Sequence, residues 1–550
     1  MSWTSRQGLA LPDLVPTALR RAWSADGHYL DTDIYRLFRR RVLAHPDRDA
    51  VIQPDSTLSY VQLDHWVGRF AGALAAAGVR DREIVAIRLP NGWPALAAEL
   101  AAARLGSVAL TFPAGPGSSE ARSLLARSRA TALITTGPLD TAGLPHLRAV
   151  LTPGRLLDQQ ESAAAAPAAD PDAPARILVS SGSEAEPKMV AYSHNAMGGG
   201  RGNYLQAVYD GEPAPRCLVL VPLSASYGSL GAVSLYRHGA TLVLLDRFDP
   251  VTALRAITEH RVTHLFGVAT TLRRMTAQPP CADEDLSSLR AVIASADELP
   301  AGALAAALER FGRPVSNVYG SSDGVNCRGE YRTARAETTV LDHPDPAVCD
   351  FEVRDEQGGP LPAGAAGELW ARGPMTPLCY VGAPELDARN RDADGWVRTG
   401  DHGLIGHDGR LRLLRRNSQL IKRGGYSISL AEVERHAAAH PALAEAVCVP
   451  VPDEDLGERL CVCVVPQQDH PAPTLTELNH FLEEQCGLER RKLPEQLVAL
   501  PTLPLSSTGK LSRRELSRIA RENPAQPEPS QAQPAPSEPA LGHLLRAEHA

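Results

Sequence analysis

The most informative stretch of the sequence is ILVSSGSEAEPK, residues 177–188. Its first three residues are branched apolar residues typical of a buried strand, and small hydroxyl residues around a glycine follow directly. A loop of this kind offers free backbone N–H groups and short hydroxyl donors that can surround a phosphate, and Lys188 adds a positive charge. The stretch lacks the G-x-x-x-x-G-K-[ST] spacing of a Walker A loop, and an ordinary polar loop has the same composition.

Short apolar runs alternate with helical periods on both sides of this stretch. The apolar runs predict strands at residues 84–87, 132–134, 177–179, 218–220, 241–245 and 263–266. Helices are predicted between them, among others at residues 70–77 and 95–105. Strands that alternate with helices are typical of mainly parallel sheets, so we expect an α/β fold.

The pattern changes between residues 340 and 415, where shorter apolar runs are separated by turn sequences. These hairpin signals predict a barrel-like or antiparallel β subdomain with strands at residues 352–354, 367–370 and 411–414. The chain beyond residue 425 predicts a small α+β unit with a helix at 430–440, strands at 446–451 and 460–466, and a helix at 475–485.

These changes divide the chain into three parts. We expect an N-terminal core at residues 1–417, a mobile C-terminal domain at 418–521 and a disordered tail at 522–550. The tail is rich in Pro, Ala, Gln, Glu and Ser, a composition that buries too little apolar surface to fold.

The composition excludes several classes of protein. The 550 residues include 56 Lys and Arg and 64 Asp and Glu, a net charge of −8, so the chain lacks the basic field of most nucleic-acid-binding proteins. Its nine cysteines include no C-x-x-C pair, which favours reduced thiols and a cytoplasmic location. The long apolar stretch at residues 95–108 is interrupted by Glu99 and Arg104, so we expect no membrane span.

A second candidate motif is NVYGSSDG, residues 317–324. Tyr319 offers a flat ring on which a purine can stack, Ser322 offers a hydroxyl, and Asp323 can hold a hard cation such as Mg²⁺. A strand that ends in a turn has the same pattern.

Three further motifs follow toward the C-terminus. Residues 396–403 place Asp401 in a tight turn, where a carboxylate can accept hydrogen bonds from both ribose hydroxyls, although T-G-D is also a plain turn sequence. Residues 415–425 are cationic and end in two glycines, which suits a hinge between domains beside a bound anion. Residues 504–513 carry Lys510 on a glycine-containing loop, from which it can reach a phosphate or remain solvated.

In order and spacing, these five motifs resemble the adenylate-forming superfamily of acyl- and aryl-CoA ligases, luciferases and adenylation domains of nonribosomal peptide synthetases. The resemblance extends from about residue 28 to 520. It is strongest to stand-alone aryl-acid ligases of the 2,3-dihydroxybenzoate and salicylate type, on the stretches at residues 18–29, 187–189, 194–195 and 423–425.

The resemblance implies an enzyme with an N-terminal domain of two mixed α/β sheet subdomains and a small barrel-like β subdomain, followed by the mobile α+β domain. In this family a carboxylic acid reacts with ATP to give an acyl adenylate and pyrophosphate, and a pantetheine thiol then displaces AMP. The implied cofactors are ATP, magnesium and, as acyl acceptor, CoA or phosphopantetheine. The implied partners are a small carboxylic acid and a carrier protein, in secondary metabolism such as antibiotic biosynthesis. Monomer and homodimer both stay open.

The resemblance also assigns roles to individual residues. Lys510 matches the lysine that bridges the acid and the nucleotide, and Ser322 and Asp323 match groups that contact the α-phosphate and magnesium. The residues matched to nucleotide binding are Ser180, Ser181, Gly182, Ser183, Lys188, Ser295, Ala296, Tyr319, Gly320, Asp401 and Arg416. The residues expected around the acid are Ala225, Ser226, Tyr227, Gly267, Ser295 and Gly320, and Gln419 is the expected hinge.

Some positions depart from the family pattern. The phosphate loop has Glu184 and Ala185 where relatives carry threonine and glycine, and Gln419 replaces an aspartate. Ala225 replaces a common histidine, and Ser226 stands where dihydroxybenzoate ligases carry an asparagine. We therefore expect slower adenylation and a different acid. Two alternatives remain open: a degenerate relative that binds a nucleotide or partner without turnover, and a ligase for an unusual acid such as an amino acid or an inorganic oxyanion.

Overall fold

The computed structural model describes residues 2–114, 118–157, 169–180, 187–295, 299, 301–416, 420–423, 426–453, 457–468, 470–488, 490–506 and 511–523. The chain divides into two compact units. The first unit comprises Met1–Leu420 and Pro504–Ser512, and the second comprises Ile421–Leu503 and the residues from Arg513 onward. The predicted domain boundary after residue 417 and the predicted hinge Gln419 lie outside the described residues. Of the predicted tail at 522–550, residues from 524 onward also lie outside them, whereas Glu522 is the last residue of a helix.

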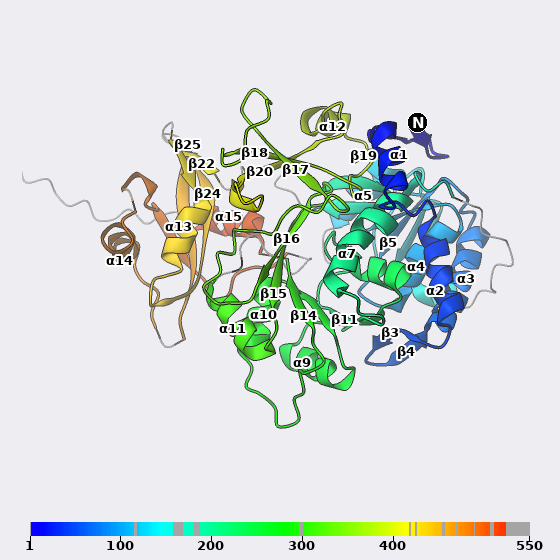
Figure 1. Cartoon of the computed structure of the whole chain (residues 1–550), viewed down its shortest axis with the longest axis horizontal. Helices are drawn as coiled ribbons and strands as arrows, with labels where there is room; N and C mark the ends of the chain where they lie inside the picture. Colours follow the sequence, from blue (N-terminus) through cyan, green and yellow to red (C-terminus); the bar gives the residue numbers. More distant parts are fainter. Residues whose placement is uncertain are drawn as a thin grey trace, which may run out of the picture. The chain divides into compact units, whose positions relative to one another are not determined.

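Within the described residues, the first unit contains a seven-stranded sheet (Figure 1). Its strands, in spatial order, are β19 (Cys379–Tyr380), β10 (Lys188–Ser193), β9 (Pro174–Ser180), β6 (Val108–Thr111), β5 (Ile84–Arg88), β7 (Ala132–Thr135) and β8 (Ala149–Leu151). The five strands from β9 to β8 are parallel, whereas β10 and β19 are antiparallel additions at one edge. The described ends of the stretch at residues 177–188, β9 and β10, therefore form an antiparallel strand pair.

The described residues also form an eight-stranded sheet in the same unit. Its strands, in spatial order, are β16 (Asn326–Tyr331), β15 (Val315–Gly320), β14 (Ala291–Ala294), β13 (His264–Gly267), β11 (Arg216–Val219), β12 (Thr241–Val243), β3 (Asp49–Gln53) and β4 (Ser56–Ser59). The six central strands are parallel, and the two edge strands are antiparallel. Both sheets confirm the α/β class.

The strands form where they do because successive side chains alternate between two apolar cores. In β5, Val85 and Ile87 face a core that also contains residues of β11 and β12, whereas Ile84 and Ala86 face a second core with residues of the helix at residues 118–128. All five residues of β5 are buried. A strand that is buried on both faces appears in the sequence as a continuous apolar run, and for this reason the runs predicted these strands.

Helices cover the sheets and connect their parallel strands. The helices of the first unit are α1 (Thr17–Ala25), α2 (Ile34–Ala44), α3 (Tyr60–Ala76), α4 (Trp93–Arg104), α5 (Ser118–Ser128), α6 (Pro153–Leu157), α7 (Arg201–Tyr209), α8 (Ser229–Val233), α9 (Pro250–Glu259), α10 (Ala269–Thr276), α11 (Ala301–Phe311) and α12 (Pro384–Asn390). Two π-helical turns, Ala196–Gly200 and Ser234–His238, precede α7 and follow α8. Apolar residues of α9, α10 and α11 pack on one face of the eight-stranded sheet (Figure 1).

A four-stranded antiparallel sheet confirms the predicted β subdomain. Its strands are β17 (Asp350–Arg354), β18 (Gly367–Arg372), β20 (Val397–Ile405) and β21 (Leu411–Arg416). The turn at residues 355–359 between β17 and β18 contains glycine at positions 358 and 359, as is typical of turn sequences.

The second unit is a small α+β fold. Its sheet contains β22 (Leu420–Arg423), β23 (Tyr426–Ser429), β24 (Leu443–Asp453), β25 (Gly457–Pro466) and β26 (Gln496–Ala499), and its helices are α13 (Leu430–Ala437), α14 (Leu475–His480) and α15 (Arg513–Glu522). The helix predicted at 430–440 ends at Ala437, because Pro441 disfavours helical geometry at the residue before it. The helix predicted at 475–485 is α-helical only to His480 and continues as the π-helical turn Phe481–Gln485.

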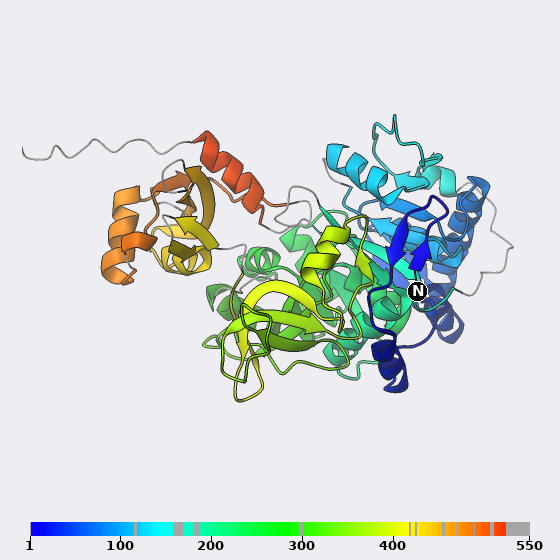
Figure 2. The ribbon, with the colours of Figure 1, turned by 90° about the horizontal axis from the view of Figure 1, so that it is seen from above.

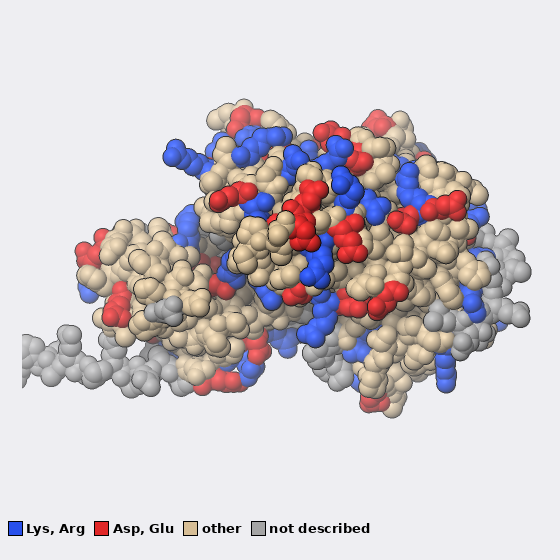
Figure 3. All heavy atoms as spheres, turned by 90° about the horizontal axis from the view of Figure 1, so that it is seen from below, with Lys and Arg blue, Asp and Glu red and all other residues tan. Residues whose placement is uncertain are grey.

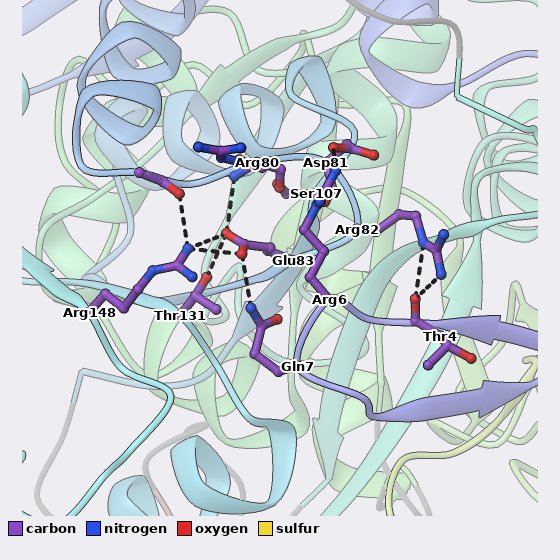
Figure 4. Close-up of polar contacts among 11 residues, drawn as sticks. Thr4, Arg6, Gln7, Arg80, Asp81, Arg82, Glu83, Ser107, Thr131 and Arg148 are labelled. Atoms are coloured by element: carbon purple, nitrogen blue, oxygen red, sulfur yellow. Dashed lines mark hydrogen bonds and ion pairs between the residues drawn. The ribbon is translucent and has the colours of Figure 1, made fainter.

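Within the first unit, an N-terminal strand pair, β1 (Ser2–Thr4) and β2 (Ala10–Pro12), packs against the rest of the unit (Figure 2). The turn between the strands reaches the buried carboxylate of Glu83, which precedes β5 (Figure 4). Glu83 accepts hydrogen bonds from Arg148 Nη2 at 2.6 Å, Gln7 Nε2 at 2.9 Å and Arg80 N at 3.0 Å. Burial tends to raise the pKa of Glu83, but these hydrogen bonds outweigh it and hold the pKa below its usual value.

Charged groups of both signs share the surface. On the face shown in Figure 3, Lys and Arg side chains are interspersed with Asp and Glu. A groove at the amino ends of β11, β13 and β14 also combines both signs, and Arg290 pairs there with Glu212 at 2.5 Å. Among the helices of the described residues, none has the length and apolar character needed to cross a bilayer.

Candidate functional site

The carboxyl ends of β13, β14 and β15 lie side by side and carry several of the predicted site residues. Gly267 ends β13, Ser295 follows β14, and Tyr319 and Gly320 end β15. The backbone N–H of Ser295 donates to the Gly267 carbonyl at 3.1 Å, and Ala294 is in register with Asn317 of β15. Ligands of parallel α/β sheets bind at this edge, so the strands place these residues where a nucleotide site is expected.

Tyr319 and Asp401 meet across two sheets at this edge. The Tyr319 hydroxyl donates to Asp401 Oδ2 at 2.6 Å, and the two residues are only 5% and 6% exposed. Asp401 lies within strand β20 rather than in the predicted tight turn, and its N–H donates to Thr399 Oγ1 at 3.1 Å. Asp401 is also in register with the backbone of Arg416 in β21. The structure thus brings together the residues predicted for adenine and ribose.

The turn between β15 and β16 carries Ser322 and Asp323, and two buried tyrosines hold it. The Tyr192 hydroxyl donates to the Ser322 carbonyl at 2.8 Å, and the Tyr380 hydroxyl donates to Asp323 Oδ1 at 2.7 Å. Burial raises the pKa of Tyr192 to about 12, and burial together with the charge of Asp323 raises the pKa of Tyr380. Both hydroxyls therefore remain protonated donors at neutral pH.

Tyr380 also links this turn to the predicted phosphate loop. The Lys188 ammonium lies 5.8 Å from the centre of the Tyr380 ring, within the range of a cation–π interaction. Lys188 begins β10 and is in register with Ser180, the last residue of β9. The pairing of β9 with β10 therefore brings the two ends of the predicted loop together. It also places Lys188 over Tyr380, whose hydroxyl binds Asp323.

The donor set at Asp323 suits magnesium. Mg²⁺ in nucleotide sites uses one or two carboxylates, together with phosphate oxygens and water. Tyr380 binds one oxygen of Asp323, and a carboxylate has further lone pairs for a cation. In the part of the chain that the structure describes, no group of three His, Cys, Asp or Glu side chains forms a separate metal cluster.

The segment predicted to contact the acid lies between β11 and α8. The Tyr227 hydroxyl donates to the Ile293 carbonyl of β14 at 2.9 Å, and its ring lies 6.3 Å from that of Phe266 in β13. Tyr227 is therefore next to the strand ends that carry Gly267 and Ser295. Ala225 and Ser226 precede Tyr227 in the same turn.

Some predicted residues lie outside the described part of the chain. These are Ser181, Gly182, Ser183, Ala296, Gln419 and Lys510, and for Arg416 only the backbone is described. Two residues that supported the resemblance, His194 and Asn195, bind the backbone and side chains of the N-terminal segment. His194 Nδ1 accepts a hydrogen bond from the Ile34 N–H at 3.3 Å, and the Asn195 amide binds Asp31. They anchor the segment before α2.

Sequence reasoning missed Tyr192 and Tyr380. Each lies within an apolar run, MVAYS and LCYVG, where a tyrosine has the appearance of a core residue. No local pattern reveals that their hydroxyls reach the turn at Ser322 and Asp323, because that contact depends on how the strands are arranged.

Comparison with known proteins gives consistent matches. Residues 38–381 match the family model of AMP-binding enzymes, and residues 432–510 match the model of the AMP-binding enzyme C-terminal domain. The chain is 30% identical to salicyl-AMP ligase / salicyl-S-ArCP synthetase of Mycobacterium tuberculosis, over 90% of this chain and 91% of that protein. It is 29% identical to pyochelin synthase PchD of Pseudomonas aeruginosa, over 92% and 96%. Its structure resembles amide bond synthetase McbA of Marinactinospora thermotolerans with a TM-score of 0.74 and 28% identity, over 88% and 99%.

Proposed function

Because the chain belongs to the AMP-binding enzyme family of adenylate-forming ligases, we propose that it activates a small aromatic carboxylic acid with ATP and transfers the acyl group to a pantetheine thiol. The two relatives whose names refer to salicyl transfer and to pyochelin support an aromatic acid and a role in secondary metabolism. The thiol belongs to a carrier protein or to CoA, and we propose that the reaction takes place in the cytoplasm.

The contact between Tyr319 and Asp401 is the observation that carries this proposal. The ring of Tyr319 offers a platform for adenine. Asp401 accepts one hydrogen bond from Tyr319, and a carboxylate has further lone pairs for the hydroxyls of a ribose. A platform and an acceptor joined in this way suit a nucleoside.

In the first proposed step, an oxygen of the acid forms a bond to the α-phosphorus of ATP while the bond to pyrophosphate breaks. The reactants are both anions, so positive charge and orientation lower the barrier. We assign Lys188 to the phosphates of ATP and Lys510 to the acid and the α-phosphate. Asp323 would hold Mg²⁺, which supplies positive charge beside the departing pyrophosphate.

In the second proposed step, the sulfur of the thiol forms a bond to the acyl carbon, and the bond from that carbon to AMP breaks. We propose that residues 418–521 rotate about Gln419 between the two steps, as in the family that the chain resembles. The residues proposed to rotate, 418–521, include Lys510, whereas the structure groups Pro504–Ser512 with the first unit. Because Lys510 would be displaced by the rotation, we assign it to the first step only.

The direct test is acid-dependent exchange of labelled pyrophosphate into ATP, with benzoate, salicylate, 2,3-dihydroxybenzoate and aliphatic acids as the panel. We expect exchange with at least one aromatic acid and a loss of about a hundredfold or more in Lys510→Ala. Exchange that stays at the level of Lys510→Ala with every acid contradicts the proposal.

A second candidate is a relative that binds a nucleotide without turnover. The glutamate at position 184 favours it, because a carboxylate in the predicted phosphate loop repels pyrophosphate. Calorimetric binding of ATP together with absent exchange for all acids, amino acids and oxyanions supports this candidate. Exchange restored in Glu184→Thr identifies the loop as the cause.

A further inference from the structure

The turn between β11 and α8 forms a closed loop, residues 222–228, which we call the pocket loop. A Cβ atom at Gly228 would lie 1.9 Å from the Pro222 carbonyl oxygen, so the two ends of the loop touch and only glycine fits there. The pocket loop carries Ala225, Ser226 and Tyr227, the residues proposed to contact the acid. It belongs to no helix or strand, and besides turn hydrogen bonds of its own, such as that from the Ala225 N–H to the Pro222 carbonyl at 3.0 Å, it is held by side chains from other elements.

Arg176 holds the first half of the pocket loop. It lies in β9 of the other sheet and is fully buried. Its Nη2 donates to the Leu223 carbonyl at 2.6 Å and to Thr111 Oγ1 at 2.9 Å, while Nη1 binds the Glu99 carboxylate at 2.7 Å. A buried ion pair gains little net stability after its desolvation cost, so its main effect here is to fix a geometry.

Arg201, the first residue of α7, holds the second half. Its Nη2 donates to the Ser226 carbonyl and, at 2.9 Å, to Ser229 Oγ, and its guanidinium lies 5.4 Å from the centre of the Tyr192 ring. Arg201 is 3% exposed, and burial lowers its pKa. Among the described residues, no carboxylate is among the groups that act on the charge of Arg201, and its Nε and Nη1 have no hydrogen-bond partner. Burial of a cation without a carboxylate partner costs free energy of folding, so the charge of Arg201 adds little to stability.

We propose that Arg176 and Arg201 are positioning residues that determine which acid the enzyme accepts. The two arginines bind the carbonyls of Leu223 and Ser226. The orientation of these two peptide groups determines the direction of the side chains that follow them in the pocket loop, those of residues 224–227. A displacement of about 1 Å at a reacting site can cost a hundredfold in rate. The inference rests on the proposed function, because it concerns the acid that is activated.

Arg201→Met is the cleanest test, since it leaves no unpaired carboxylate behind. In the exchange assay we expect the KM for the preferred acid to rise about tenfold or more, the KM for ATP to change less than about twofold, and the order of preference among the acids to change. Arg201→Lys keeps a charged donor for the Ser226 carbonyl and recovers part of the loss. The double variant Arg176→Met with Glu99→Leu removes both buried charges together. We expect it also to raise the KM for the acid more than the KM for ATP.

The matched control is the double variant Arg310→Met with Glu284→Leu. It removes an ion pair of 2.7 Å between Arg310 of α11 and Glu284, whose side chains are only 11% and 9% exposed and have, among the described residues, no hydrogen bond to the pocket loop. We expect its acid preference to equal that of the unmodified chain. If Arg201→Met does not fold, the double variant Arg176→Met with Glu99→Leu carries the test by the same comparison of KM for acid and ATP.

Three outcomes overturn the inference. A folded Arg201→Met with an unchanged KM and acid preference shows that the pocket loop does not need the arginine. If Arg201→Met raises the KM for ATP as much as the KM for the acid, and Arg201→Lys does not lower either value, the role of Arg201 is purely structural. Absent exchange in the unmodified chain overturns the proposed function, and this inference with it.

Discussion

The hydroxyl of Tyr319 donates to Oδ2 of Asp401 at 2.6 Å, and this contact joins the last parallel strand of the eight-stranded sheet to the four-stranded sheet. The two residues are 82 positions apart in the chain. Because both are buried, the hydrogen bond forms in surroundings of low polarity, where it is strong. The protein itself therefore orients the carboxylate proposed to bind ribose.

Tyr319→Phe tests this orientation. The substitution keeps the ring but removes a hydrogen bond to a charged group, so we expect the KM for ATP in the exchange assay to rise about tenfold while the KM for the acid stays nearly constant. Tyr331→Phe in the neighbouring strand is the control, because it removes a buried hydroxyl that donates to the Thr338 carbonyl at 2.8 Å. If the KM for ATP rises equally in Tyr319→Phe and Tyr331→Phe, the effect does not depend on the contact with Asp401.

Tyr380→Phe tests the support of Asp323. Groups that orient a metal-binding carboxylate typically contribute ten- to a hundredfold to metal affinity, so we expect the Mg²⁺ concentration for half-maximal exchange to rise about tenfold. Asp323→Asn has the larger effect, because it removes the charge itself. The control is Tyr236→Phe, a buried hydroxyl without a hydrogen-bond partner among the described residues. Unchanged Mg²⁺ dependence in Tyr380→Phe rejects the role of this contact.

Glu83→Gln tests stability away from the site. Glu83 accepts hydrogen bonds from Arg148 and Gln7 and connects the N-terminal segment to β5 (Figure 4). Loss of the charged acceptor costs about 2 kcal/mol of the free energy of unfolding, measured with urea, and leaves the KM values unchanged. In Asp408→Asn, where an exposed pair with Arg412 is lost, we expect a much smaller loss of stability, because solvent screens that pair. Equal costs contradict the structural role of Glu83.

The buried histidines predict how stability depends on pH. Burial lowers the pKa to about 4 for His194 and His264 and to about 3 for His238, where Arg237 adds to the effect. The unfolded chain binds these protons near pH 6.5, so unfolding takes up protons between about pH 6.5 and 4. Stability is therefore complete above pH 6.5 and falls as the pH decreases through this range. His264→Gln removes one such group, so the urea midpoint of unfolding falls less steeply with decreasing pH. If the urea midpoint of His264→Gln depends on pH as steeply as that of the unmodified chain, the lowered pKa of His264 does not contribute to acid sensitivity.

The sequence was sufficient for the parts of the fold that depend on local patterns. Buried strands such as β5 and β7 are continuous apolar runs, and the turn-rich region after residue 340 is the four-stranded sheet. Element ends were less predictable. The helix from Leu475 changes to π-helical hydrogen bonding after His480, and its apolar periodicity does not change there.

The sequence singles out candidate site residues one by one, but it does not predict how they are arranged. Tyr319 and Asp401 each belong to a motif with a chemical meaning, whereas their contact follows from the register of two separate sheets. Tyr380 and Arg176 had no signal at all, since a tyrosine in an apolar run and an arginine at a strand position gain their meaning only from distant partners. Those partners, Asp323 and Leu223, are 57 and 47 residues away.

Detection of the acyl adenylate tests the central claim most directly. The unmodified chain is incubated with ATP, Mg²⁺ and the acid panel in the absence of any thiol, and bound small molecules are measured by native mass spectrometry. We predict one acyl adenylate per chain with an aromatic acid, a much lower amount in Tyr319→Ala and none in Lys510→Ala. Bound ATP that never gives an adenylate with any acid would contradict the account.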